Sequence, residues 1–139
     1  MIRIVPDTNV IVSAFFWGGP PREILVASQN KRCQIVTSET LLAELLDVIS
    51  RPKFADRLTI IGQTPTGLMN LYRALAEIVE PAKIQPIIVD DPDDDVLIAC
   101  ALGGSAEVIV SGDRHLRELG EYQGITVQTV RQFLDSLAS

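Results

Sequence analysis

Short apolar runs alternate with longer amphipathic segments along this chain of 139 residues. The apolar runs, each typical of a buried β-strand, are residues 2–6, 34–37, 86–89, 107–110 and 125–127. Regular alternation of strand-like and helix-like segments is the pattern of a parallel sheet covered by helices. We therefore expect an α/β fold of three α/β/α layers, with a parallel sheet of about five strands and residues 1–139 in a single domain.

Capping residues and prolines predict where several helices begin and end. Pro20 and Pro21 fit the first turn of a helix, because a proline there loses no helical hydrogen bond. Ser38 is a typical N-cap for a helix that begins at Glu39, and a further helix is expected over residues 65–79. The apolar stripe of that last helix is a candidate dimer face, and its members are Leu68, Leu71, Tyr72, Leu75, Ile78 and Val79.

Acidic side chains follow three of the predicted strands. Asp7 ends the first strand, Asp113 follows the fourth, and residues 90–95 form an acidic run after the third. The carboxyl ends of parallel strands meet at one crevice, so these carboxylates are expected to converge. Clustered carboxylates repel one another unless protons or a cation neutralise them. An all-oxygen cluster of this kind suits Mg²⁺ or Mn²⁺.

Each of these acids also has a purely structural interpretation. Asp7, Asp93 and Asp113 each precede a predicted helix, where a carboxylate caps free N–H groups. Glu44 lies at the edge of an apolar helical stripe, a position typical of a half-exposed surface group. Capping explains Asp95 less well, because it falls inside the first turn of its helix. An accidental gathering of all these acids near strand ends is less plausible than a shared function.

Composition restricts the class of protein. Hydrophobic residues make up 47% of the chain, which is enough for a real core, and no apolar run approaches the roughly 20 residues of a membrane span. Pro6 and Asp7 follow Met1 too closely for a signal peptide to form. Cys33 and Cys100 are interpreted as reduced thiols, which predicts a cytoplasmic protein.

The net charge of −6 argues against a general nucleic-acid binder. Much of that charge lies in the acidic cluster, however, and a bound divalent ion would cancel part of it. Basic residues gather at Arg51, Lys53 and Arg57, which are candidates for RNA contacts. A solvated loop is the competing interpretation of these three residues.

Other candidate sites are weaker. His115 is the only histidine and is interpreted as a surface residue near the crevice. Neither a nucleophile elbow nor a phosphate-binding GxxxxGK[ST] loop is present. The aromatic run Phe15, Phe16 and Trp17 favours core packing over a base-stacking platform, although Trp17 beside Gly18 is a candidate for exposure.

Taken together, the motifs resemble those of the PIN domain family over nearly the whole chain. They are Asp7-Thr8-Asn9 after the first strand, Glu44 in the helix after the second, Asp95-Val96-Leu97-Ile98-Ala99 in the helix after the third, and Ser111-Gly112-Asp113 after the fourth. The Asp-rich entry to the third motif and the Val-Ser-Gly-Asp ending are similar to the branch that comprises toxins of bacterial toxin–antitoxin pairs.

The resemblance implies strand order 3-2-1-4-5 and metal-dependent cleavage of single-stranded RNA. By motif position, it implies that the metal-binding and catalytic acids are Asp7, Glu44, Asp95 and Asp113. It assigns supporting polar roles to Thr8 or Asn9 and to Ser111. The acidic run leaves the third acid open, with Asp95 preferred for its match to the following helix and Asp94 as the alternative. An antitoxin partner and a homodimer are expected as well.

Two other functions compete with a ribonuclease. A receiver or an aspartate-based phosphoryl-transfer protein would place a lysine near the end of its last strand, or a second Asp where Asn9 stands, and this chain has neither. The second alternative is a catalytically silent PIN-like module that binds RNA or protein. The complete set of acids favours an active enzyme over that module.

Overall fold

The structure is a computed structural model that describes residues 1–84 and 92–138, with the side chains of residues 92 and 93 left out. The strands are β1 (Ile2–Pro6), β2 (Cys33–Thr37), β3 (Glu77–Ile78), β4 (Val108–Val110), β5 (Glu121–Tyr122) and β6 (Ile125–Gln128). The helices are α1 (Thr8–Phe16), α2 (Gly19–Gln29), α3 (Glu39–Ile49), the 3₁₀ turn η1 (Pro52–Phe54), α4 (Ala55–Ile61), α5 (Pro65–Leu75), α6 (Pro92–Gly103), α7 (Arg114–Leu119) and α8 (Val130–Ala138).

One mostly parallel sheet organises the fold, in the order β3-β2-β1-β4-β6-β5. Every pairing is parallel except that of β5 with β6, which form an antiparallel hairpin. With β5 set aside, the order matches the predicted 3-2-1-4-5. The predicted α/β class and the parallel sheet are therefore confirmed.

The third strand differs from the prediction. β3 pairs with β2 at Val36 and Thr37, and the segment expected as a strand over residues 86–89 lies outside the described residues. Helix α5 ends at Leu75, so the prediction of a helix to residue 79 is wrong at its end. The backbone turns extended at Ala76, and Glu77 then forms an ion pair with Arg3. Backbone pairing with β2 replaces the last helical turn.

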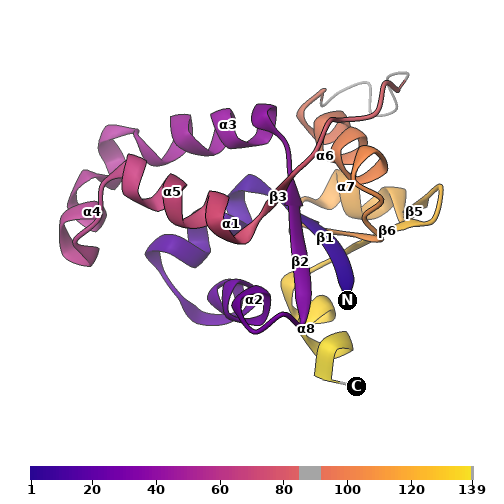
Figure 1. The fold of residues 1–139 in the computed structure, drawn as a ribbon, viewed down its shortest axis with the longest axis horizontal. Coiled ribbons are helices and arrows are strands. Elements are labelled where there is room, and N and C mark those ends of the chain that lie inside the picture. The colour runs from indigo at the N-terminus through magenta and orange to yellow at the C-terminus, as the bar shows by residue number, and fades with distance from the viewer. Residues whose placement is uncertain (85–91, 139) are drawn as a thin grey trace.

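The sheet separates two apolar layers. Residues of α1, α2, α5 and α8 pack with Ile4 and Ile35 on one side, and residues of α6 and α7 pack with Val5 and Ile109 on the other. Figure 1 shows this arrangement, with α1 and α5 on one side of the strands and α6 and α7 on the opposite side. Helix α3 lies against α1, α5 and α6. It therefore extends over one end of the sheet.

Most predicted helix starts are confirmed. Ser38 accepts a hydrogen bond from the Leu41 N–H at the start of α3, and α2 has proline in its first turn. Asp7 and Asp113 cap α1 and α7. Helix α6 begins at Pro92, so the prediction that Asp93 caps it is wrong, because Asp93 already lies in its first turn.

Both cysteines are buried and unpaired, as expected of core thiols. Burial raises the pKa of the Cys100 thiol to about 11, which keeps it protonated near neutral pH. Among the described residues, no helix combines the length and the apolar character that a membrane crossing requires.

Candidate active site at the carboxyl ends of β1 and β4

Strand register brings the first and the last acidic motif together. Pro6 of β1 pairs with Val110 of β4, and the Asp7 N–H donates to the Val110 carbonyl at 2.9 Å. Asp7 and Ser111 are therefore the next residues on two adjacent strands. This places both at the carboxyl edge of the sheet, where parallel α/β folds bind ligands.

The Ser111 hydroxyl connects the two carboxylate-bearing loops. It donates to the Asp7 Oδ2 atom at 2.8 Å and accepts the Asp113 N–H at 3.0 Å. Asp113 in turn accepts the Leu116 N–H at 3.1 Å, which holds it at the start of α7. Ser111 is fully buried, so this connection is shielded from water. Ser111, for which a supporting role was predicted, therefore contacts both Asp7 and Asp113 directly.

The environment of Asp7 disfavours its charge. Burial raises the pKa of the Asp7 carboxyl, the hydrogen bond from Ser111 and that from the Asn9 backbone lower it, and the charge of Asp113 raises it again. The net direction is upward from the ordinary value near 3.8. A carboxylate that is both buried and close to a second one is a place where a cation would be favourable.

Glu44 reaches the same end of α1 from α3. The Thr8 hydroxyl donates to a Glu44 carboxylate oxygen at 2.9 Å. Thr8 is buried at 6% exposure and directly follows Asp7, while Glu44 is half-buried. Ser111 therefore contacts Asp7 and the backbone of Asp113, and Glu44 contacts Thr8, the chain neighbour of Asp7.

The two candidates for the third acid, Asp94 and Asp95, lie near the start of α6. Asp94 is buried at 4% exposure and lies on the same helical face as Leu97 and Ile98, which pack toward the sheet. Asp95 is half-buried and lies on a different face. Helix α6 contacts β1, β2, β4 and α3, so its buried face is turned toward the sheet and α3.

Oxygen donors alone make up this site. Within the described residues, no three acidic, histidine or cysteine side chains form a ready cage for an ion. Mg²⁺ does not need such a cage, because it commonly keeps several waters and takes one or two carboxylates together with substrate phosphates. The pair Asp7 and Asp113, with a buried and disfavoured charge on Asp7, fits that kind of ion.

The predicted basic residues lie beyond the far end of α3. Arg51 forms an exposed ion pair with Asp47 at 3.1 Å. Lys53 lies 5.1 Å from the centre of the Phe54 ring, and Arg57 donates to the Phe16 carbonyl. They belong to the η1–α4 segment, which follows the helix that carries Glu44.

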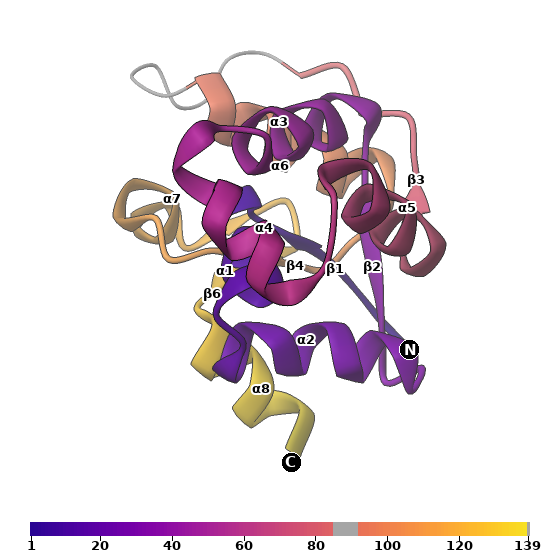
Figure 2. The same cartoon turned by 90° about the vertical axis from the view of Figure 1, so that its left-hand side faces the viewer.

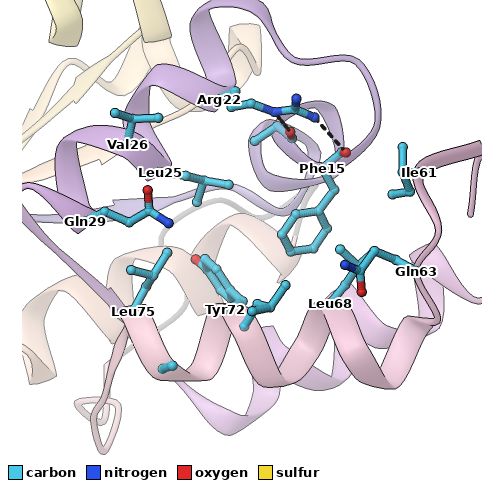
Figure 3. Close-up of a pocket in the computed structure, with 13 residues that line it drawn as sticks. Phe15, Arg22, Leu25, Val26, Gln29, Ile61, Gln63, Leu68, Tyr72 and Leu75 are labelled. Atoms are coloured by element: carbon cyan, nitrogen blue, oxygen red, sulfur yellow. Dashed lines mark hydrogen bonds between the residues drawn. The ribbon is translucent and has the colours of Figure 1, made fainter.

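A separate hollow lies between α2 and α5, and no sequence pattern pointed to it. It encloses about 520 Å³ and is lined mainly by apolar side chains, among them Phe15, Leu25, Leu68 and Tyr72. At one end Arg22 donates hydrogen bonds of 3.0 Å to the Ala14 and Phe15 carbonyls, drawn as dashed lines in Figure 3. The hollow forms only when α2 and α5 face each other, which sequence spacing does not reveal.

Comparison with known proteins agrees with this geometry. The family model described as "PIN domain" matches residues 3–115, from β1 through the start of α7. The chain belongs to the PIN domain family. PIN domains are generally nucleases, and those nucleases typically use divalent metal ions. The four acidic positions of this PIN domain all fall within the matched residues.

Solved structures share the fold of this PIN domain. One is the crystal structure of VapBC2 from Rickettsia felis bound to a DNA fragment from their promoter, with 14% identity and a TM-score of 0.58. The match covers 92% of this chain and 98% of that one. No well-characterised protein matches the sequence significantly.

Proposed function

We propose that this PIN domain is a divalent-metal-dependent endoribonuclease that cleaves phosphodiester bonds of single-stranded RNA. The observation that carries the proposal is the unit formed by Asp7, Ser111 and Asp113. It holds two carboxylates at the carboxyl edge of the sheet, and burial together with the second charge disfavours the ionised form of Asp7. Such a unit gains from a cation, and RNA cleavage is chemistry that a cation assists.

Each residue of the site has a defined part in this mechanism. Asp7 and Asp113 would hold Mg²⁺ or Mn²⁺, and Ser111 fixes the orientation of the Asp7 carboxylate. When bound, the ion supplies an activated water and neutralises charge at the scissile phosphate. Glu44, whose carboxylate accepts the Thr8 hydroxyl, would be a further ligand or would orient a water. No histidine base is needed, and Asn9, exposed at the rim, is available to the substrate.

For the third acid we propose Asp94 in place of the sequence-based preference for Asp95. Its burial on the sheet-facing side of α6 supports this assignment. Asp95, on a more open face, would then serve the start of the helix, where acids complement its dipole.

We further propose that the enzyme is the toxin of a cytoplasmic toxin–antitoxin pair. The structural similarity to a chain of VapBC2 supports a two-component assembly. The apolar hollow between α2 and α5 is suited to apolar side chains of an antitoxin, and the exposed Val26 and Leu71 line it. Replacing Leu71 with Asp should weaken antitoxin binding and leave RNA cleavage unchanged, since the hollow lies away from the carboxylates.

Cleavage of defined oligonucleotides tests the enzymatic proposal. Single-stranded RNA, double-stranded RNA and single-stranded DNA of one sequence are incubated with the protein in Mg²⁺, in Mn²⁺ and in chelator. We expect cleavage of single-stranded RNA only, and only with a divalent ion. RNA binding without cleavage under every condition would identify the protein as a silent RNA-binding module.

A further inference from the structure

Helix α1 exposes a single stripe along its length. All its residues are buried except Asn9 and Ser13, and its C-cap residue Trp17 is 58% exposed. The three residues are spaced by four, so they follow one another on one side of the helix. The stripe begins next to Asp7, the N-cap, and ends at Trp17.

The stripe ends in a group of aromatic rings and cations. Phe54 of η1 stacks on Phe16 with ring centres 4.9 Å apart, and Trp17 meets Phe54 edge-on at 5.9 Å. The Arg57 guanidinium lies 5.2 Å from the centre of the Trp17 ring, and Lys53 is 5.1 Å from that of Phe54. Buried Phe16 and Phe54 thus support a tryptophan that is itself open to solvent.

Two residues of the stripe, Asn9 and Ser13, also line a shallow hollow. Asn9, Val10 and Ser13 form one wall, Gly112 and Thr129 lie among its other lining residues, and its volume is about 430 Å³. Gly112 stands between Ser111 and Asp113 of the candidate active site. The stripe is therefore continuous with the site at one end and with the aromatic group at the other.

We propose that this stripe is the track along which single-stranded RNA leaves the active site, with one base stacked on Trp17. Lys53 and Arg57 then lie beside the neighbouring phosphates. The inference rests on the proposed function and adds where the substrate lies. Proteins bind single strands by pairing a cationic groove with exposed aromatic rings, because every base has a face that can stack.

The length and charge of the track fit this ligand. Asp7 and Trp17 are ten residues apart on one helix, a rise of roughly 15 Å, so a strand of a few nucleotides spans it. Helix α4 lies against α1, and the chain from α3 into η1 runs beside the same region (Figure 2). The basic residues beside Trp17 favour a polyanion. Of the three, Arg51 already forms an ion pair with Asp47. Lys53 and Arg57 therefore carry the charge contacts.

Trp17 is the only tryptophan in the chain, so its fluorescence reports on the proposed contact directly. A single-stranded RNA of about ten nucleotides is titrated into the Asp7→Asn protein in Mg²⁺, so that binding is observed without cleavage. We expect saturable quenching of the tryptophan emission, as stacking requires. In parallel, Trp17→Ala in the same background should lower the affinity roughly tenfold, the order of one lost stacking contact, and Trp17→Phe should restore part of it.

Matched controls separate the track from general surface effects. Ile60→Ala removes an even more exposed apolar side chain, at 69% exposure, from neighbouring α4 and should leave the affinity unchanged. Lys53→Gln should weaken binding and reduce its salt dependence, whereas Lys31→Gln, shortly before the amino end of β2, should not. Circular dichroism melting of each variant confirms that it is folded.

The outcomes distinguish this inference from the proposed nuclease. Unchanged RNA affinity in Trp17→Ala, in a protein that cleaves RNA, overturns the track and leaves the nuclease. Quenching and the predicted loss of affinity, in a protein whose wild type cleaves nothing, support the track and remove the nuclease. If Trp17→Ala instead loses only binding of a protein partner, Trp17 belongs to a protein interface and the track is wrong.

Discussion

The Ser111 hydroxyl donates a hydrogen bond of 2.8 Å to the Asp7 carboxylate across the neighbouring strands β1 and β4. The same hydroxyl accepts the Asp113 N–H, so one buried oxygen sets the relative position of two catalytic candidates. Asp7 and Asp113 are separated by more than a hundred residues of sequence. Their arrangement depends on strand register and on this serine.

Replacing Ser111 with Ala should therefore harm both stability and activity. The Asp113 N–H loses its partner, and a lost or unsatisfied buried hydrogen bond costs about 1–3 kcal/mol. Urea unfolding of the metal-free protein measures that cost. Ser111→Cys fills similar volume with a weaker donor and serves as the comparison. Stability equal to wild type in Ser111→Ala would show that the hydroxyl does not organise the site.

Asp7→Asn should stabilise the metal-free protein near neutral pH. The folded state raises the pKa of Asp7, so it holds the proton more tightly than the unfolded chain. The stabilisation that protonated Asp7 contributes is therefore present at low pH. It is lost as the pH rises from about 3.8 through the raised pKa of the folded state. Asparagine keeps one acceptor oxygen for the Asn9 N–H, and its NH2 group then faces the Ser111 hydroxyl, whose oxygen can accept from it.

Urea unfolding between pH 4 and pH 7 in chelator measures this effect. We expect the wild-type free energy of unfolding to fall across the range more steeply than that of Asp7→Asn. A mutant that is less stable than wild type at pH 7 would mean that the ionised carboxylate of Asp7 stabilises the metal-free fold, contrary to this account.

The third acid can be decided by a pair of substitutions. Asp94→Asn should lower metal-dependent cleavage by roughly a hundredfold or more, as expected for loss of a ligand to a catalytic ion. Asp95→Asn should lower it far less, and both metal-free proteins should be about as stable as wild type, because repulsion between carboxylates is relieved. The reverse order of activities would restore Asp95 to the site.

Self-association stays a prediction. The structure limits the part of the α5 stripe that is exposed enough to form a dimer surface. Of the expected stripe on α5, Leu68 and Tyr72 are buried, and Leu71 is 56% exposed. Light scattering at tens of micromolar, roughly where weak dimers are detected, should give twice the chain mass of 15.2 kDa. A mass of one chain would remove the homodimer.

The sequence predicted the fold and the location of the acids because both follow from local patterns. Apolar runs predicted β1, β2, β4 and β6, and parallel strands end at one edge, so Asp7 and Asp113 were expected together. The sequence did not show which acidic residue of α6 faces the sheet. The helix begins at Pro92 and not at Asp93 or Asp95, and neighbouring residues of a helix point about 100° apart. The burial of Asp94 is the reason that we propose it, and not Asp95, as the third acid.

Other features depend on contacts between distant segments. Ile78 continues the helical spacing of α5, but it pairs with Thr37 of β2 and is therefore a strand residue. Core packing was favoured for the run Phe15, Phe16 and Trp17, and exposure was left open for Trp17. Phe15 and Phe16 are indeed buried, but Trp17 is exposed, because Phe54 from η1 covers Phe16 and leaves the Trp17 ring outside.

Cleavage of a single-stranded RNA by wild type, Asp7→Asn and Asp135→Asn, each in Mg²⁺ and in chelator, tests the central claim most directly. Asp135 is an exposed acid on α8 and controls for the loss of one negative charge. We predict cleavage by wild type and Asp135→Asn that depends on Mg²⁺, and none by Asp7→Asn. Cleavage by Asp7→Asn at the wild-type rate, or cleavage that persists in chelator, would contradict a metal-dependent nuclease built on this carboxylate.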